Sequence, residues 1–210
     1  MAEWLELHPQ NPQARWIRRA ADSVLAGGVV VYPTDSCYAL GCAIGERDAA
    51  QRLRRIRGFD RHHLFTLVCS DLSEIATYAK VDNRCYRLLK SATPGPFTFV
   101  LQATRELPRR ILQERRKTIG IRIPDHRGTQ ALLQALGKPL LSCTFQWPGE
   151  PLPVNSPRDC ARQLDGLVDV VLDGGPCGLE PTTVVDLSGG APELLRHGAG
   201  DPAILGLDGA

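Results

Sequence analysis

Arg122 is the residue whose surroundings say most about chemistry, because it lies in an otherwise apolar stretch, residues 119–124, that predicts a strand. An arginine in a buried strand needs an anionic partner, since desolvation of an unpaired guanidinium costs several kcal/mol. That partner is either the carboxylate of a ligand or a structural Asp or Glu of the chain. The residues alone leave both alternatives open.

Arg55 and Arg57 form a second pair of candidate anion ligands. They lie at the end of a predicted helix and precede Gly58, which is typical of a helix C-cap. Two guanidinium groups two residues apart suit one polyphosphate, because arginine binds phosphate through a planar fork of donors. Cations also favour helix C-termini through the helix dipole, so a purely structural role is the alternative.

Small polar side chains follow the buried strand predicted over residues 29–32. Thr34, Asp35 and Ser36 come directly after it, at the kind of strand end where α/β sheets bind ligands. The same three residues also suit a turn, because Asp and Ser side chains bond to nearby backbone. We therefore expect either a small polar ligand or a turn here.

Further hydroxyl and guanidinium groups stand at the ends of predicted strands. Thr98 follows a stiff turn at residues 94–96, Thr183 begins a strand after Pro181, and Arg196 ends another strand. A stiff loop holds a phosphate at a small entropic cost, although most such loops are only corners. Each of these residues is a weak signal by itself.

The positions of these candidates depend on alternating helices and strands. Apolar residues repeat at helical spacing up to Leu25, and Asn11 followed by Pro12 suits the N-cap and first position of that helix. Ser156 and Asp159 resemble a capping box that opens a late helix. The alternation predicts an α/β fold with a mixed parallel and antiparallel sheet flanked by helices. Helices are predicted over 12–25, 48–56, 72–78, 84–89 and 129–136, and a loop or helix near 108–113. Strands are predicted over 29–32, 38–42 (a return strand or a bend), 64–69, 97–102, 118–123, 139–143, 168–172, 183–187 and 193–196.

The composition is that of an ordinary globular protein. The chain has 210 residues, of which 43% are hydrophobic and 23% charged, with a formal net charge of +2. These values exclude intrinsic disorder, and no apolar run is long enough for a membrane span or a signal peptide. We expect a single domain over residues 1–210, with its core at about 12–200, in a cytoplasmic protein.

Motifs for several other chemistries are missing from the sequence. The seven cysteines show no C-x-x-C spacing, and there is no H-E-x-x-H, P-loop or dinucleotide-binding glycine motif. We therefore expect no metal site. Any phosphate chemistry must use side chains scattered around a preformed cavity.

Taken in order, the polar segments resemble the motifs of the YrdC family, the L-threonylcarbamoyladenylate synthases. The ordered set is far more specific than any one segment, and it extends from about residue 12 to residue 200. The resemblance implies a twisted mixed α/β sheet around a concave, positively charged cavity. The matching segments are 28–41 (GVVVYPTDSCYALG), 55–57 (RIR), 94–98 (PGPFT), 120–124 (GIRIP), 181–186 (PTTVVD) and 195–198 (LRHG).

The resemblance also implies a reaction that uses ATP with Mg²⁺. Members of the family join L-threonine, bicarbonate and ATP into threonylcarbamoyl-AMP and release pyrophosphate, on the way to N6-threonylcarbamoyladenosine in tRNA. The residues implied for threonine are Thr34, Arg122 and Thr183, with Arg122 holding the carboxylate by a bidentate fork. Those implied for the nucleotide and its phosphates are Arg55, Arg57, Thr98, Thr144, Gln146 and Arg196. The motifs fix no catalytic base.

The sequence departs from the family pattern at three places. Arg55-Ile-Arg57 replaces Lys-x-Arg, and His63-Leu64 replaces a Lys-Pro pair. Thr144-Phe145-Gln146 replaces Ser-x-Asn, so the longer Gln146 and the bulky Phe145 are expected to alter the nucleotide pocket. This pattern is most similar to the YciO branch of the family, whose members need not share the synthase activity.

Two functions are therefore predicted. The first is a threonylcarbamoyl-AMP synthase or a close enzymatic relative, a nucleotidyltransferase. The second is a protein without synthase activity that binds tRNA or double-stranded RNA through phosphate contacts on its basic face. The residues predicted for that face are Arg52, Arg54, Arg55, Arg57, Arg61, Arg115, Arg116 and Lys117.

Overall fold

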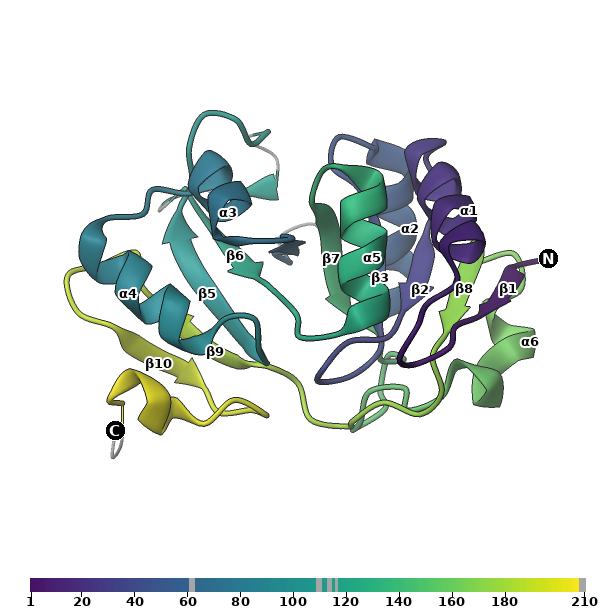
Figure 1. Cartoon of the computed structure of the whole chain (residues 1–210). Helices are drawn as coiled ribbons and strands as arrows, with labels where there is room; N and C mark the ends of the chain where they lie inside the picture. The colour runs from purple at the N-terminus through teal and green to yellow at the C-terminus, as the bar shows by residue number, and fades with distance from the viewer. Residues whose placement is uncertain (61–62, 109–110, 113–114, 116, 208–210) are drawn as a thin grey trace.

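The chain alternates helices with strands, as the apolar pattern predicts (Figure 1). The computed structural model describes residues 1–60, 63–108, 111–112, 115 and 117–207. All five predicted helices occur with small shifts of their ends, while the loop or helix predicted near 108–113 lies partly outside the described residues. The helices are α1 (Ala14–Leu25), α2 (Arg47–Arg57), α3 (Leu72–Tyr78), α4 (Asn83–Ala92), α5 (Arg127–Leu136) and α6 (Ala161–Leu164), with 3₁₀ turns η2 (Pro157–Cys160) and η3 (Pro202–Leu205).

Two predicted helix starts are wrong. α1 begins after Gln13, whose extended backbone (φ −68°, ψ 118°) makes it the N-cap and places Asn11 and Pro12 outside the helix. Ser156 precedes η2, but its side chain makes no capping hydrogen bond. The N–H of Asp159 donates instead to the backbone carbonyl of Ser156 at 3.2 Å, which closes a 3₁₀ turn.

All nine predicted strands occur, and they join a tenth in one mixed sheet. The sequence missed β1, a four-residue edge strand too short to show alternation, which pairs parallel with β8. The sheet order is β1-β8-β2-β3-β7-β4-β6-β5-β9-β10, with both parallel and antiparallel neighbours. The strands are β1 (Glu3–Glu6), β2 (Val30–Tyr32), β3 (Ala39–Ala43), β4 (Thr66–Val68), β5 (Phe97–Gln102), β6 (Thr118–Arg122), β7 (Leu140–Thr144), β8 (Val170–Asp173), β9 (Thr183–Asp186) and β10 (Glu193–Arg196).

The central strands present different chemistry on their two sides. Along β5, Phe97, Phe99 and Leu101 are buried in an apolar core that also contains the buried residues of α2, α3 and α4. Thr98 and Val100 alternate with them and therefore point to the opposite side of the sheet. The side of Thr98 is thus polar at β5, whereas near β2 and β8 the same side is covered by a second apolar core with α1 and α5.

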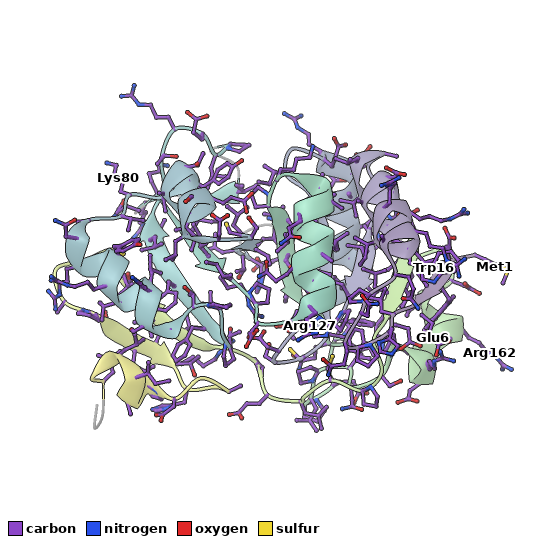
Figure 2. All side chains as sticks on the ribbon, in the orientation of Figure 1. Met1, Glu6, Trp16, Lys80, Arg127 and Arg162 are labelled. Atoms are coloured by element: carbon purple, nitrogen blue, oxygen red, sulfur yellow. The ribbon has the colours of Figure 1, made fainter. Side chains whose placement is uncertain are left out.

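Figure 1 shows the sheet spanning two groups of helices. α1 and α5 pack on one face of the sheet, and α2, α3 and α4 contribute to the apolar core on the other face. Side chains fill the space around these elements, and labelled residues such as Lys80 and Arg162 point outward from the periphery (Figure 2).

Candidate functional site

A cavity of about 320 Å³ lies on the polar side of the central strands. This volume falls within the range of about 300–1,000 Å³ that is usual for small-molecule sites. β5 contributes Thr98 and Val100, and β6 contributes Thr118, Gly120 and Arg122. These residues share a side because alternate residues of a strand point the same way.

Six of the nine predicted site residues line this cavity, and three do not. The six are Arg57, Thr98, Arg122, Thr144, Gln146 and Arg196. Thr34, Arg55 and Thr183 are not among the described lining residues. The fold therefore gathers most of the predicted positions from segments that are far apart in the sequence.

Arg122 is buried and has a protein partner on each terminal nitrogen. Nη2 donates to the carboxylate of Asp35, and Nη1 donates to the hydroxyl of Ser36 at 3.3 Å. The second carboxylate oxygen of Asp35 accepts the backbone N–H of Asp125 at 3.1 Å. Of the two partners that the sequence left open, the structure shows a structural carboxylate. The bidentate contact of Arg122 with a ligand carboxylate stays a prediction, and a ligand would share Arg122 with Asp35.

Thr34 closes the turn that holds Asp35 and Ser36. Its hydroxyl donates to the carbonyl of Cys37 at 2.6 Å and accepts the N–H groups of Ser36 and Cys37 at 3.2 and 3.3 Å. The Thr34 side chain is buried and committed to these bonds. The turn, rather than direct contact with the cavity, is therefore what this residue provides in the structure.

Arg57, the last residue of α2, is held at the cavity by Gln146. Arg57 donates to the backbone carbonyl of Gln146 and, at 3.4 Å, to its side-chain oxygen. The amide nitrogen of Gln146 donates to the carbonyl of Glu150 at 2.7 Å. Gly58 then ends the helix as the predicted C-cap, with a left-handed φ of 64°. Gln146 thus fixes the guanidinium of Arg57 beside the cavity.

An aromatic stack stands beside Arg57 in the cavity wall. The rings of Phe59 and His63 are nearly parallel with centroids 3.3 Å apart, and the guanidinium carbon of Arg57 lies 4.6 Å from the Phe59 centroid. Burial, and then the charges of Arg57 and Arg54, lower the pKa of His63. His63 is therefore neutral at neutral pH, and an anion bound nearby would raise its pKa again.

Thr98 contacts Thr182, which lies in the 181–186 motif but was not assigned to a ligand by the family resemblance. Their hydroxyl oxygens are 2.8 Å apart, both side chains are buried, and both residues line the cavity. Arg196 donates to the carbonyl of Thr182 from Nη2 at 2.8 Å and from Nε at 3.3 Å. The Arg196 guanidinium is thereby bonded to Thr182, the residue directly before β9.

Three other predicted residues have different surroundings from those expected. Arg55 is exposed on α2. Thr183 pairs with Phe97 across the sheet and donates to the carbonyl of Gly200 at 2.5 Å, on the side away from Thr98. Phe145 is fully buried in the apolar core and is not among the described lining residues. Its expected effect on the pocket is therefore wrong, because odd and even residues of this segment point to opposite sides.

Two buried guanidinium nitrogens at the cavity lack a hydrogen-bond partner. They are Nε of Arg57 and Nε of Arg122. Burial lowers the pKa of Arg57 and of Arg196, but arginine stays protonated in proteins. No Asp or Glu occurs among the described residues that line the cavity. An anionic ligand with several acceptor oxygens matches this set of donors, since an unsatisfied buried donor is destabilising.

The residues predicted for an RNA-binding face do not form one free group in the described part of the chain. Arg52 donates to Asp169 at 2.8 Å, and Arg54 lies over the ring of Phe65 at 4.5 Å. Arg61 and Arg116 lie outside the described residues. Arg55, Arg115 and Lys117 are exposed. RNA binding by these residues stays a prediction.

The sequence missed the cavity residues that carry no motif of their own. Thr66 and Ser142 line the cavity, and the signal for them was polar–apolar alternation in short strands. That signal is weak in Thr182-Thr183-Val184, because threonine suits either side of a sheet. Only the register that pairs Thr183 with Phe97 decides which threonine faces the cavity.

Two other kinds of feature, metal-binding clusters and membrane-spanning helices, do not occur among the described residues. These residues contain no group of three His, Cys, Asp or Glu side chains that is arranged to hold a metal ion. Their helices include none with the length and apolar character needed to cross a membrane.

Comparison with known proteins places this geometry in a family. A family model described as Sua5/YciO/YrdC, "Telomere recombination", matches residues 22–198. A protein of Haemophilus influenzae is 50% identical over 204 residues, covering 97% of this chain and 99% of that protein. YciO of Escherichia coli is 49% identical over 201 residues, covering 96% and 98% of the two chains.

Solved structures agree in fold. The crystal structure of E. coli YciO superposes with a TM-score of 0.93 at 48% identity, over 97% of this chain and 99% of that one. The crystal structure of P. abyssi Sua5 complexed with L-threonine superposes with a TM-score of 0.84 at 26% identity, over 93% of this chain and 57% of that one. Motifs, fold and cavity residues together show that this chain belongs to the Sua5/YciO/YrdC family.

Proposed function

We propose that the protein is a threonylcarbamoyl-AMP synthase that uses the cavity to bind MgATP and L-threonine. The observation that carries this proposal is the pair of buried Nε atoms of Arg57 and Arg122, which lack partners at one cavity without carboxylates among its described lining residues. A similar structure, P. abyssi Sua5, is complexed with L-threonine. The fold alone would not transfer the activity, so the proposal depends on these donors.

The three arginines of the cavity have two roles in the proposal. Arg57 and Arg196 neutralise the phosphates of ATP, and Arg122 holds the carboxylate of threonine with the donors that Asp35 and Ser36 leave free. Thr98, Thr144 and Thr182 supply hydroxyl groups along the same wall. Mg²⁺ enters with the nucleotide as part of the substrate.

The reaction demands positioning more than covalent help from the protein. The threonine amine first combines with bicarbonate to give a carbamate and water. A carbamate oxygen then attacks the α-phosphorus of ATP, a new oxygen–phosphorus bond forms, and pyrophosphate leaves with the electron pair of the broken bond. Arg57 and Arg196 stabilise the charge that develops on the phosphates, in a site that is fixed before the ligand arrives.

Release of pyrophosphate tests this function. Purified protein with ATP, Mg²⁺ and bicarbonate is expected to release pyrophosphate when L-threonine is present and not when it is omitted. Arg57→Ala is expected to lower the rate by about a hundredfold or more, as the loss of one oxyanion-stabilising donor typically does. No threonine-dependent release from folded wild-type protein would contradict the proposal.

A further inference from the structure

In the contact between Thr98 and Thr182, either hydroxyl can be the donor. Their oxygens are 2.8 Å apart, and both side chains are 7% exposed. One hydroxyl hydrogen occupies the contact, and the other is left for a different acceptor. Which threonine keeps the free hydrogen decides what the pair offers to a ligand in the cavity.

Arg196 supplies the asymmetry between the two threonines. Its Nη2 lies 3.4 Å from the hydroxyl oxygen of Thr182, and the same nitrogen donates to the Thr182 carbonyl at 2.8 Å. Arginine only donates, so the Thr182 oxygen accepts from it. The Thr182 oxygen keeps a second lone pair, so either hydroxyl can be the donor in the Thr98–Thr182 contact. Donation from Thr182 to Thr98 is the arrangement that leaves the Thr98 hydrogen for a ligand.

The backbone packing holds Arg196 beside Thr182. A Cβ atom on Gly198 would lie 2.2 Å from the carbonyl oxygen of Pro181 and 2.5 Å from the carbonyl carbon of Thr182, so the chain after Arg196 packs directly on residues 181–182. The N–H of Ala199 donates to the carbonyl of Pro181 at 2.9 Å. Arg196 and Thr182 therefore keep their relative positions before any ligand binds.

We propose that Arg196, Thr182 and Thr98 form a hydrogen-bond relay that directs the Thr98 hydroxyl hydrogen to an anionic oxygen of the ligand. Thr98 is the binding residue, and Thr182 is a positioning residue that acts through it. The charge of Arg196 polarises the hydroxyls of Thr182 and Thr98, which strengthens the hydrogen bond from Thr98 to the ligand oxygen. The relay rests on the proposed function in that the ligand oxygen is taken to belong to a phosphate.

A double-mutant cycle tests the relay, with calorimetric titration of inorganic pyrophosphate and of MgATP as the two probes. Thr98→Val is expected to weaken binding by about tenfold, the typical effect of losing one bond to a charged group. Thr182→Val is expected to weaken it by about threefold, because Thr98 keeps its hydroxyl and loses only its orientation. The double variant should bind no more weakly than Thr98→Val alone.

The Thr182→Ser variant keeps a hydroxyl at this position, so it is expected to bind pyrophosphate and MgATP with the affinity of the wild type. Valine keeps the branched shape of threonine, so neither Val variant changes the strand pattern. Thr93→Val is the matched control, because the Thr93 hydroxyl donates to the carbonyl of Leu89 at 2.7 Å and Thr93 is not among the described lining residues. Urea unfolding of every variant separates lost affinity from lost stability.

Several results would overturn the relay. They are additive effects in the double variant, no effect of Thr182→Val, a Thr182→Ser variant as weak as Thr182→Val, and a wild-type protein that binds neither probe. If the cycle behaves as expected but no threonine-dependent pyrophosphate release occurs, the proposed reaction fails and the relay stands. If release occurs and the cycle is additive, the reaction stands and the relay fails.

Discussion

At the scale of single residues, Arg122 shows how the chain tolerates a charge in a buried strand. The sequence identified the residue, because an arginine among isoleucines is conspicuous. Its partner was harder to predict, since Asp35 lies 87 positions away and pairs with Arg122 only through the fold. The carboxylate is held by the turn that Thr34 closes and by the N–H of Asp125.

Asp35→Ala is expected to destabilise the protein strongly. The Arg122 and Asp35 side chains are 9% and 10% exposed, and removing one partner of a buried ion pair leaves an uncompensated charge. The expected loss is about 3–5 kcal/mol of the free energy of unfolding, measured by urea denaturation. Glu3→Ala, which removes the exposed partner of Arg19, is the control and should change little. Equal stability of the two variants would show that Asp35 is not needed to neutralise Arg122.

At the scale of secondary-structure elements, the sequence predicted where helices and strands occur better than it predicted which side of each strand faces the cavity. All nine predicted strands occur, because apolar runs between turn residues identify strands. The side that faces the cavity was harder to predict, and the motif pointed to Thr183 where the structure places Thr182. A shift of one residue exchanges the two sides of a strand, so short polar strands need their register to be known.

The start of α5 gives a prediction about pH. His126 is its N-cap, and Nδ1 accepts the N–H of Thr129 at 3.3 Å. Burial lowers the pKa of His126, partly offset by Asp35 and Asp125. The unfolded state, with an ordinary histidine pKa of about 6.5, binds more protons than the folded state below that pH. The contribution of neutral His126 to the free energy of unfolding is therefore complete above about pH 6.5 and is lost as the pH falls below that value.

His126→Asn removes this titration and keeps an acceptor for the helix, since asparagine is a good N-cap. Urea unfolding at a series of pH values between about 7.5 and 5 is expected to show a smaller loss of stability for the variant than for the wild type. His63, whose pKa burial also lowers, remains in both proteins and accounts for part of the shared slope. Parallel profiles for the two proteins would contradict the role of His126.

At the scale of the whole molecule, the site exists because the sheet joins strands from distant parts of the chain. β3 pairs with β7, β4 pairs with β6 and β7, and β5 pairs with β9, which brings their polar residues to one cavity. Local sequence patterns do not contain these pairings, so the cavity was predicted only through the family resemblance. The same resemblance did not predict that Gln146 ties down Arg57.

The most direct measurement of the central claim is a calorimetric titration of MgATP into the wild type and into Arg57→Ala. Arg57 lines the cavity with a buried, unpartnered Nε. If the cavity binds the nucleotide, the wild type binds MgATP and the variant binds it about tenfold or more weakly, while urea unfolding shows that the variant is still folded under the conditions of the titration. Equal affinity of the two proteins, or no binding to the folded wild type, would contradict the assignment of this cavity as the nucleotide site.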